Sequence, residues 1–127
     1  MLSSVGARDR MRLTNSGRGT VLAEQASRAR TFLARLRGLM GRPELAAGSG
    51  LLIEGDNAIH TCFMRFAIDV AFLDEQGQVL HLIHALPPWR ASRIVWRARA
   101  VLELPAGTLA HTRTRVGDWL VVTPAVP

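Results

Sequence analysis

Side-chain character alternates at every second residue between His60 and Phe72, and this alternation constrains the fold more than any other feature of the chain. The even-numbered positions are mostly bulky and apolar, whereas the odd-numbered positions include Thr61, Arg65 and Asp69. A period of two places successive side chains on opposite faces of a β-strand. The block is therefore predicted to be a strand with one apolar face.

A β-hairpin is predicted from the residues that follow this block. Residues 74–77 (Asp-Glu-Gln-Gly) are typical of a turn, with the glycine at a positive φ, and residues 79–86 are a second apolar run. The loop length decides which side chain faces Asp69. A loop of two or four residues places His84 opposite, and a loop of three places Ile83 there.

Shorter apolar runs between turn signals predict the remaining strands. Residues 12–15 and 20–24 flank a Ser-Gly-Arg-Gly turn and indicate an opening hairpin. Residues 89–100 show no clear period and are predicted to be irregular. Further strands are expected at residues 51–54, 101–104 and 119–123.

One helix is predicted, over about residues 27–41. Ser27 is a favourable N-cap, apolar residues recur with a helical period from Phe32 to Met40, and Gly41 is a stop signal. Arginines occupy the other face, as in amphipathic helices that lie on a sheet. The fold class is therefore predicted to be α+β and mostly β, a compact antiparallel β-barrel or sandwich with this helix packed on it.

The length and the N-terminal sequence limit the domain organisation. At 127 residues the chain has the size of one domain. We expect a flexible extension over residues 1–10, with Met11 as an alternative start to Met1, and a single globular domain over 11–127. No apolar run approaches the roughly 20 residues of a membrane-spanning helix. Without a secretory signal and with Cys62 as its one cysteine, the chain is expected to be cytoplasmic and free of membrane.

The charge pattern raises nucleic-acid binding as one hypothesis. All 16 basic residues are arginine, the formal net charge is +6, and Trp89 and Trp96 stand among arginines. No recognised nucleic-acid motif accompanies this pattern, and GC-rich coding also produces arginine in place of lysine. We therefore favour other partners over nucleic acid.

The chain lacks the usual sequence signatures of several enzyme classes. The chain has no G-x-x-x-x-G-K-[ST], G-x-G-x-x-G after a strand, H-E-x-x-H, C-x-x-C or G-x-S-x-G motif. His60 and Cys62 share a strand face and would form a base-activated thiolate if Asp69 oriented the imidazole. A single cysteine in an apolar strand is more typical of a small core residue, which is the interpretation we favour.

Metal binding would need three or four convergent ligands. His81 and His84 are three residues apart, which places them on opposite faces of a strand. We therefore predict no metal site and no cofactor. The candidate ligands considered for such a site are His60, Asp69, Asp74, His81 and His84.

Asp69 needs a partner, because a carboxylate inside an apolar strand is destabilising unless it is paired or hydrogen-bonded. Arg65 shares its strand face four residues away. We favour a carboxylate that accepts backbone N–H groups and fixes a bend or turn. A ligand contact is the alternative.

Five ordered motifs resemble a known protein family. They are RGLMGR at 37–42, IHTCFMRFAIDVAFLDEQGQV at 59–79, LPPWR at 86–90, VLELPAG at 101–107 and VGD at 116–118. Together, over about residues 20–122, they resemble the uncharacterised prokaryotic family catalogued as domain of unknown function 192. The resemblance implies an antiparallel β-barrel or sandwich with one main helix, and it implies no established reaction.

The same resemblance marks a set of signature positions. Cys62 stands where an aromatic residue is common in that family, and Ala67 stands where proline is common. The first departure disfavours thiol chemistry further. The remaining signature positions are expected to be structural, apart from Met64 and Asp69: Gly38, Leu39, Met40, Phe72, Glu103, Gly107, Gly117 and Asp118.

Two functional hypotheses follow. The first is a small binding domain, monomeric or weakly dimeric, whose concave sheet face receives a small molecule or a peptide. The second is a small hydrolase or transferase that uses Asp69, His60 or Glu103 as acid or base. The ligand-binding residues expected under the first hypothesis are Met64, Arg65, Asp69, His84, Pro87 and Trp89.

Overall fold

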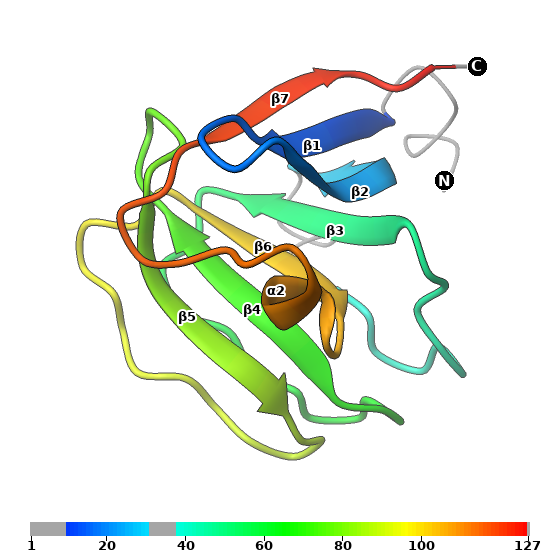
Figure 1. Ribbon diagram of the computed structural model, residues 1–127. Helices are drawn as coiled ribbons and strands as arrows, with labels where there is room; N and C mark the ends of the chain where they lie inside the picture. The colour runs from blue at the N-terminus through cyan, green and yellow to red at the C-terminus, as the bar shows by residue number, and fades with distance from the viewer. Residues whose placement is uncertain (1–9, 31–37, 127) are drawn as a thin grey trace.

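Seven β-strands form one curled sheet, a half-barrel that is open along one side (Figure 1). The computed structural model describes residues 10–30 and 38–126. The strand order across the sheet is β5-β4-β6-β3-β2-β1-β7. The strands are β1 (Met11–Asn15), β2 (Thr20–Ala29), β3 (Ser49–Glu54), β4 (Ile68–Leu73), β5 (Val79–Leu86), β6 (Ala100–Pro105) and β7 (Leu120–Pro124).

The strands pair antiparallel except for β2 and β3, which run parallel. At one end of the sheet, the two edge strands come together. The Leu120 N–H donates to the Gly77 carbonyl at 2.9 Å, and the Val79 N–H donates to the Asp118 carbonyl at 2.8 Å. These bonds join the start of β5 to the start of β7, so the sheet must curl.

A short helix, α2 (Thr108–His111), lies within the concave side of the sheet (Figure 1). Leu109 of this helix is fully buried among apolar side chains of the concave face, including Leu13 of β1 and Leu102 and Leu104 of β6. We call this group the inner core. It packs the helix against both halves of the curled sheet.

A second apolar cluster, the outer core, covers the other face of the sheet. Val70 and Phe72 of β4 and Val101 of β6 pack there against side chains from outside the sheet. Those covering side chains come from the turn at residues 38–41 and from loops 55–67 and 87–99: Leu39, Ile59, Met64, Val95 and Ala98. Because both faces are covered, all six residues of β4 are buried.

The predicted fold class is confirmed: the described chain is mostly β, and its hairpins β1–β2 and β4–β5 lie where the turn signals indicated. Gly77 has the predicted positive φ, at 91°. The long predicted strand from His60 is wrong in its first half. The strand β4 begins only at Ile68, and the residues before it form turns and bends in which Phe63 has a φ of 65°, outside the extended region.

The predicted helix at 27–41 is wrong at both ends. Residues 27–29 belong to β2, where Ser27 pairs with Leu51 and Ala29 pairs with Ile53 of β3. Residues 38–41 form a turn, and residues 31–37 of the prediction lie outside the described residues. Pairing with a strand that is distant in sequence overrides local helical preference, and a periodicity argument cannot detect it.

No helix among residues 10–30 and 38–126 is long and apolar enough to cross a membrane. The helix that those residues do contain, α2, has four residues. A helix this short carries too few positions for an apolar period, which is why the sequence did not indicate it.

Candidate functional site

Loops 55–67 and 87–99 lie side by side and are joined by backbone hydrogen bonds. The Thr61 N–H donates to the Arg90 carbonyl at 2.7 Å, and the Trp89 N–H donates to the Thr61 carbonyl at 3.0 Å. Farther along, the Ser92 N–H donates to the Ile59 carbonyl at 2.8 Å. The two loops therefore form an irregular antiparallel ladder, in which each loop is hydrogen-bonded to the other.

The buried side chain of Thr61 strengthens this junction. Its hydroxyl donates to the Pro87 carbonyl at 2.6 Å and accepts the Arg90 N–H at 2.8 Å. Thr61 is fully buried, so these bonds are shielded from water. One threonine thus fixes the position where residues 87–90 turn away from β5.

Two aromatic side chains project from this junction. The rings of Phe63 and Trp89 have their centroids 4.7 Å apart, with their planes tilted by 59°. Phe63 is 59% exposed and Trp89 is 57% exposed. Both have positive φ, 65° and 63°, a conformation that bulky residues seldom adopt without support from their surroundings. We call this pair the aromatic tip.

The turn at residues 38–41 adjoins the aromatic tip. The Gly41 N–H donates to the Phe63 carbonyl at 3.0 Å. Leu39 is buried in the outer core, whereas Met40 is partly exposed. Three segments that are far apart in sequence therefore converge at this end of the molecule.

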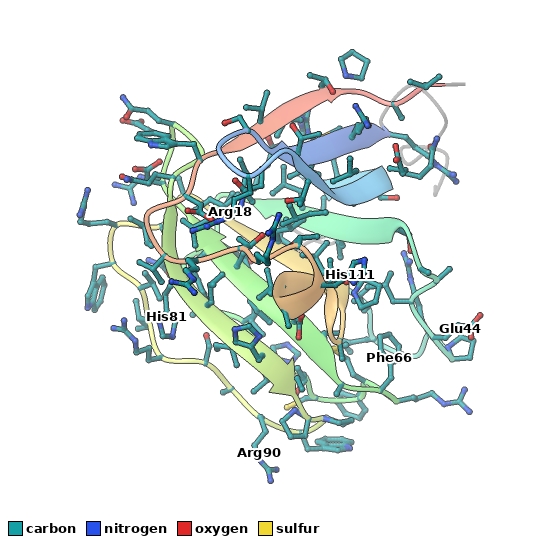
Figure 2. The ribbon with its side chains drawn as sticks, in the orientation of Figure 1. Arg18, Glu44, Phe66, His81, Arg90 and His111 are labelled. Carbon is teal, nitrogen blue, oxygen red and sulfur yellow. The ribbon has the colours of Figure 1, made fainter. Side chains whose placement is uncertain are left out.

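Arginines flank the aromatic tip. Arg65 follows Phe63 by two residues, Arg90 follows Trp89 directly, and both are exposed. Figure 2 shows the Arg90 side chain pointing outward from the end of the molecule where β5 finishes. The site thus combines exposed aromatic rings with exposed positive charge.

The structure separates the residues that the binding hypothesis grouped together. Met64 is buried in the outer core, and Asp69 is buried on the opposite, concave face. His84 is exposed near the end of β5. Of the remaining predicted residues, Pro87 and Trp89 lie at the Thr61 junction, and Arg65 lies beside Phe63.

Both oxygens of the Asp69 carboxylate accept hydrogen bonds from backbone N–H groups. Its Oδ1 accepts the Ala85 N–H at 2.8 Å, and its Oδ2 accepts the Gly107 and Leu109 N–H groups at 3.0 Å and 2.8 Å. Asp69 is fully buried. These three bonds tie β4 to β5 and to the first turn of α2, so the side chain has the structural arrangement that its sequence context favoured.

A β-bulge resolves which residue faces Asp69. Ile68 pairs with Leu86 and Val70 pairs with Ile83, so His84 and Ala85 together lie opposite Asp69. Ala85 has a φ of 50°, which turns its N–H toward the carboxylate. Neither of the simple registers, with His84 or Ile83 alone opposite Asp69, occurs.

Glu103 is the second buried carboxyl group and lies on the other face of the sheet. It is 2% exposed, and its Oε1 has no hydrogen-bond partner among the described residues. Burial raises the pKa of Glu103 to about 8, Arg42 opposes this rise, and Asp56 adds to it. Glu103 is therefore mostly protonated at neutral pH.

The residues of the acid–base hypothesis do not meet in one place. Asp69 faces the inner core, Glu103 faces the outer side of the sheet, and His60 is exposed in loop 55–67. The His60 Nδ1 accepts the Cys62 N–H at 3.1 Å, which is a bond to the backbone and not to the thiol. The described residues contain no group of three or more His, Cys, Asp or Glu side chains that could hold a metal ion.

A groove of about 400 Å³ lies elsewhere, between β2 and the segment that leads into α2. Its lining consists mostly of apolar and small residues, with Glu24 and His111 as the ionisable groups. Figure 2 shows the side chain of His111, the last residue of α2. Glu24 is already paired with Arg12 at 2.9 Å. Of the residues selected from the sequence, Gly107 lines this groove.

Several signature residues have structural positions. Phe72 is fully buried, and Gly107 and Gly117 both have a φ of 96°, which glycine adopts without strain. Asp118 accepts the Arg18 Nε and the Asn15 Nδ2, each at 2.9 Å. The hydrogen bonds from Arg18 hold the pKa of Asp118 at about 2, with burial opposing and Asn15 and the Arg115 N–H adding to the effect.

Neither Phe63, which completes the aromatic tip, nor Thr61, which supports it, was predicted as a site residue from the sequence. One signal was present: Phe63 is the one large apolar residue at an odd-numbered position between His60 and Phe72, where the other odd positions hold alanine or the polar residues Thr61, Arg65 and Asp69. An apolar residue out of phase with a strand pattern marks either a break in the strand or an exposed hydrophobic side chain. Phe63 is both.

Comparison with known proteins finds relatives of similar sequence. A UPF0127 protein of Thermococcus sibiricus is 32% identical over 110 residues, which is 84% of this chain and 71% of that protein. A UPF0127 protein of Pyrococcus furiosus is also 32% identical, over 85% of this chain and 95% of the relative.

Two crystal structures share the architecture. One is a protein of unknown function from Novosphingobium aromaticivorans, with a TM-score of 0.76 and 21% identity over 88% of this chain and 83% of that one. The other is described as a putative transcription regulator from Sinorhizobium meliloti, with a TM-score of 0.75 and 25% identity over 89% and 92%. The family model DUF192, described as "Uncharacterized ACR, COG1430", matches residues 12–122. The chain therefore belongs to the DUF192 family.

Proposed function

We propose that this protein is a binding domain without a reaction of its own, and that the aromatic tip receives an extended segment of another protein. The observation that carries the proposal is the exposure of Phe63 and Trp89, which touch each other and are both more than half accessible. Exposed aromatic groups that are held in place are typical of interaction sites.

The shape of the aromatic tip favours a protein segment over a small molecule. Sites for small molecules usually bury most of the ligand surface in a concavity. Phe63 and Trp89 project from the junction of two loops, so they offer a surface and not an enclosure. Tryptophan and arginine are enriched among the residues that dominate protein–protein affinity, and Trp89 is followed directly by Arg90.

The support beneath the aromatic tip is rigid. The backbone and hydroxyl bonds of Thr61 fix residues 87–90, and the Gly41 N–H fixes the Phe63 carbonyl. Binding to such a surface orders few additional side chains, which reduces the entropic penalty of association. The positive φ values of both aromatic residues are maintained by the same support.

The acid–base alternative has less support. Both oxygens of Asp69 are occupied by backbone N–H groups, and Glu103 lies on the opposite face of the sheet from Asp69. A general acid or base must reach a substrate proton within hydrogen-bonding distance. A carboxylate with three backbone donors is better suited to holding strands and helix together.

Two further parts of the proposal concern the setting in which the domain acts. We expect it to act in the cytoplasm, because Cys62 is a free thiol and a reducing compartment preserves free thiols. We also expect a monomer or a weak homodimer. Fractionation of cells that express a tagged chain, and sedimentation of the purified protein, test these two expectations.

A random peptide library displayed on phage tests the binding role. We expect the protein to enrich a set of related peptides whose affinity falls by roughly tenfold or more in Trp89→Ser and Phe63→Ser. The matched control is Trp119→Ser, which removes a tryptophan that is 45% exposed and precedes β7. Enriched peptides that bind Trp89→Ser as tightly as the unmodified protein, or no enrichment at all, would reject the proposal.

A further inference from the structure

The proposed binding surface continues from the aromatic tip along loop 87–99. Beyond Trp89, this loop exposes Ile94 and Trp96, the latter 75% accessible. It also exposes four arginines and contains no aspartate or glutamate. We call the following exposed residues the loop strip: Trp89, Arg90, Arg93, Ile94, Trp96 and Arg97.

The positive charge of the loop strip is not compensated within the described part of the chain. Arg90, Arg93 and Arg97 form no ion pair with any residue in 10–30 or 38–126. By contrast, four arginines of the first two strands and their connections are paired with carboxylates: Arg12, Arg18, Arg28 and Arg30. Part of the unpaired positive charge of the described residues therefore lies on the same loop as Trp89. The rest is carried by arginines outside this loop: Arg10, Arg42, Arg65, Arg113 and Arg115.

Resting on the proposed function, we infer that the partner segment is acidic and carries several Asp or Glu side chains beside an apolar or aromatic one. Guanidinium groups bind carboxylates through paired, charge-assisted hydrogen bonds. An uncompensated positive strip also accelerates encounter with an acidic partner. The partner's apolar residue would contact Phe63 and Trp89, and its carboxylates would contact Arg90 and Arg93.

A short extended segment can reach from Trp89 to Arg93. Trp89 and Arg93 are four residues apart, so their Cα atoms are separated by at most about 14 Å. An extended peptide of about four or five residues covers that distance. A short acidic segment can therefore contact the aromatic tip and both arginines at once.

The aromatic geometry favours a peptide over nucleic acid. Proteins that bind single strands stack bases on free ring faces. The planes of the Phe63 and Trp89 rings are inclined by 59° at a centroid distance of 4.7 Å, so the two rings do not offer parallel faces to consecutive bases. Such a pair is better suited to hold an apolar side chain than to stack consecutive bases.

Fluorescence titration of the most enriched library peptide tests the inference. Its counterpart has every Asp changed to Asn and every Glu to Gln. We expect the counterpart to bind about tenfold more weakly or worse, and the acidic peptide to lose about tenfold in affinity between low and high salt. Arg90→Glu should weaken binding similarly. Arg10→Glu is the control, because it changes the net charge equally and precedes β1.

The outcomes separate this inference from the proposed function. Binding that depends on Trp89 but not on peptide carboxylates, salt or Arg90 would overturn the acidic partner and leave the binding role intact. If no peptide bound in a way that depends on Trp89, both the acidic partner and the binding role would be overturned. Oligothymidylate or oligouridylate that bound more tightly than the peptide, through Trp89, would assign the surface to nucleic acid instead.

Discussion

Asp69 in β4 accepts the backbone N–H of Leu109 in α2 at 2.8 Å, and this bond anchors the helix inside the half-barrel. The same carboxylate oxygen accepts the Gly107 N–H, while the other oxygen accepts the Ala85 N–H. One side chain therefore satisfies donors from a β-bulge and from the start of a helix. Buried backbone donors need such partners, since leaving them unpaired is destabilising.

Replacing Asp69 tests this arrangement. Asn offers one acceptor oxygen and presents an N–H₂ group toward a backbone donor, so Asp69→Asn should lower the free energy of unfolding by roughly 2–3 kcal/mol. Urea denaturation at neutral pH measures the change. Asp74→Asn is the control, because both backbone bonds of Asp74 use the same oxygen, Oδ1, and Asn can keep them. An equal loss in both variants would contradict the role of the second Asp69 oxygen.

Ionisation of Glu103 should destabilise the folded protein at alkaline pH. Its pKa is about 8 in the folded protein, against an ordinary value of 4.5 for an exposed glutamate, so the folded chain retains a proton that the unfolded chain loses. The contribution is fully present below pH 4.5 and is lost as the pH rises through about 8. Since one pKa unit corresponds to about 1.4 kcal/mol, the expected fall is a few kcal/mol.

Denaturation at a series of pH values from acid to alkaline measures this fall. Glu103→Gln should be less sensitive to pH over that range, because the amide does not ionise. Its stability should exceed that of the unmodified protein at alkaline pH. A parallel decline in both proteins would show that another group is responsible.

Asp118 should have the opposite effect, in acid. Its pKa is lowered to about 2, chiefly by the hydrogen bonds from Arg18, and is thus below the ordinary value of 3.8. The stabilisation is present above the ordinary value and is lost as the pH falls through about 2. Asp118→Asn should therefore melt below the unmodified protein at neutral pH, and the two melting temperatures should converge in acid.

The matched variant for Asp118 is Arg18→Gln, which leaves the carboxylate its bonds from Asn15 and the Arg115 N–H. Asp118→Asn disturbs all of these bonds at once, whereas Arg18→Gln removes only those from Arg18. Arg18→Gln should therefore lower the melting temperature at neutral pH less than Asp118→Asn does. Circular dichroism melts at matched pH measure both.

Thr61 should control both stability and the aromatic tip. Thr61→Val preserves shape and removes the hydroxyl bonds with Pro87 and Arg90, so we expect a loss of roughly 1–3 kcal/mol. The peptide affinity should also fall, because residues 87–90 would no longer be held in the binding geometry. Thr61→Ser keeps the hydroxyl and should retain most of both properties. Unchanged affinity in a less stable Thr61→Val protein would separate the tip from its support.

The sequence determined the features that arise between neighbouring residues. Alternation and turn chemistry located the hairpins β1–β2 and β4–β5, because such turns are closed by a few consecutive residues. An acidic residue within an apolar strand indicated that Asp69 must have backbone partners, and its burial with three N–H groups agrees with that interpretation. The sequence does not indicate which backbone N–H groups bind the Asp69 carboxylate, since one of the donors, Leu109, is 40 residues away.

Tertiary structure alone decided the features that depend on distant pairing. The N-cap signal at Ser27 predicts the start of a helix, but residues 27–29 belong to β2, since β3 supplies a parallel partner for their backbone groups. The aromatic tip exists because Thr61 joins loop 55–67 to loop 87–99, and neither loop indicates the other in sequence. Local sequence fixes turns and periodicity, whereas contact between distant segments depends on the packing of the whole chain, and the site proposed here is built from such contacts.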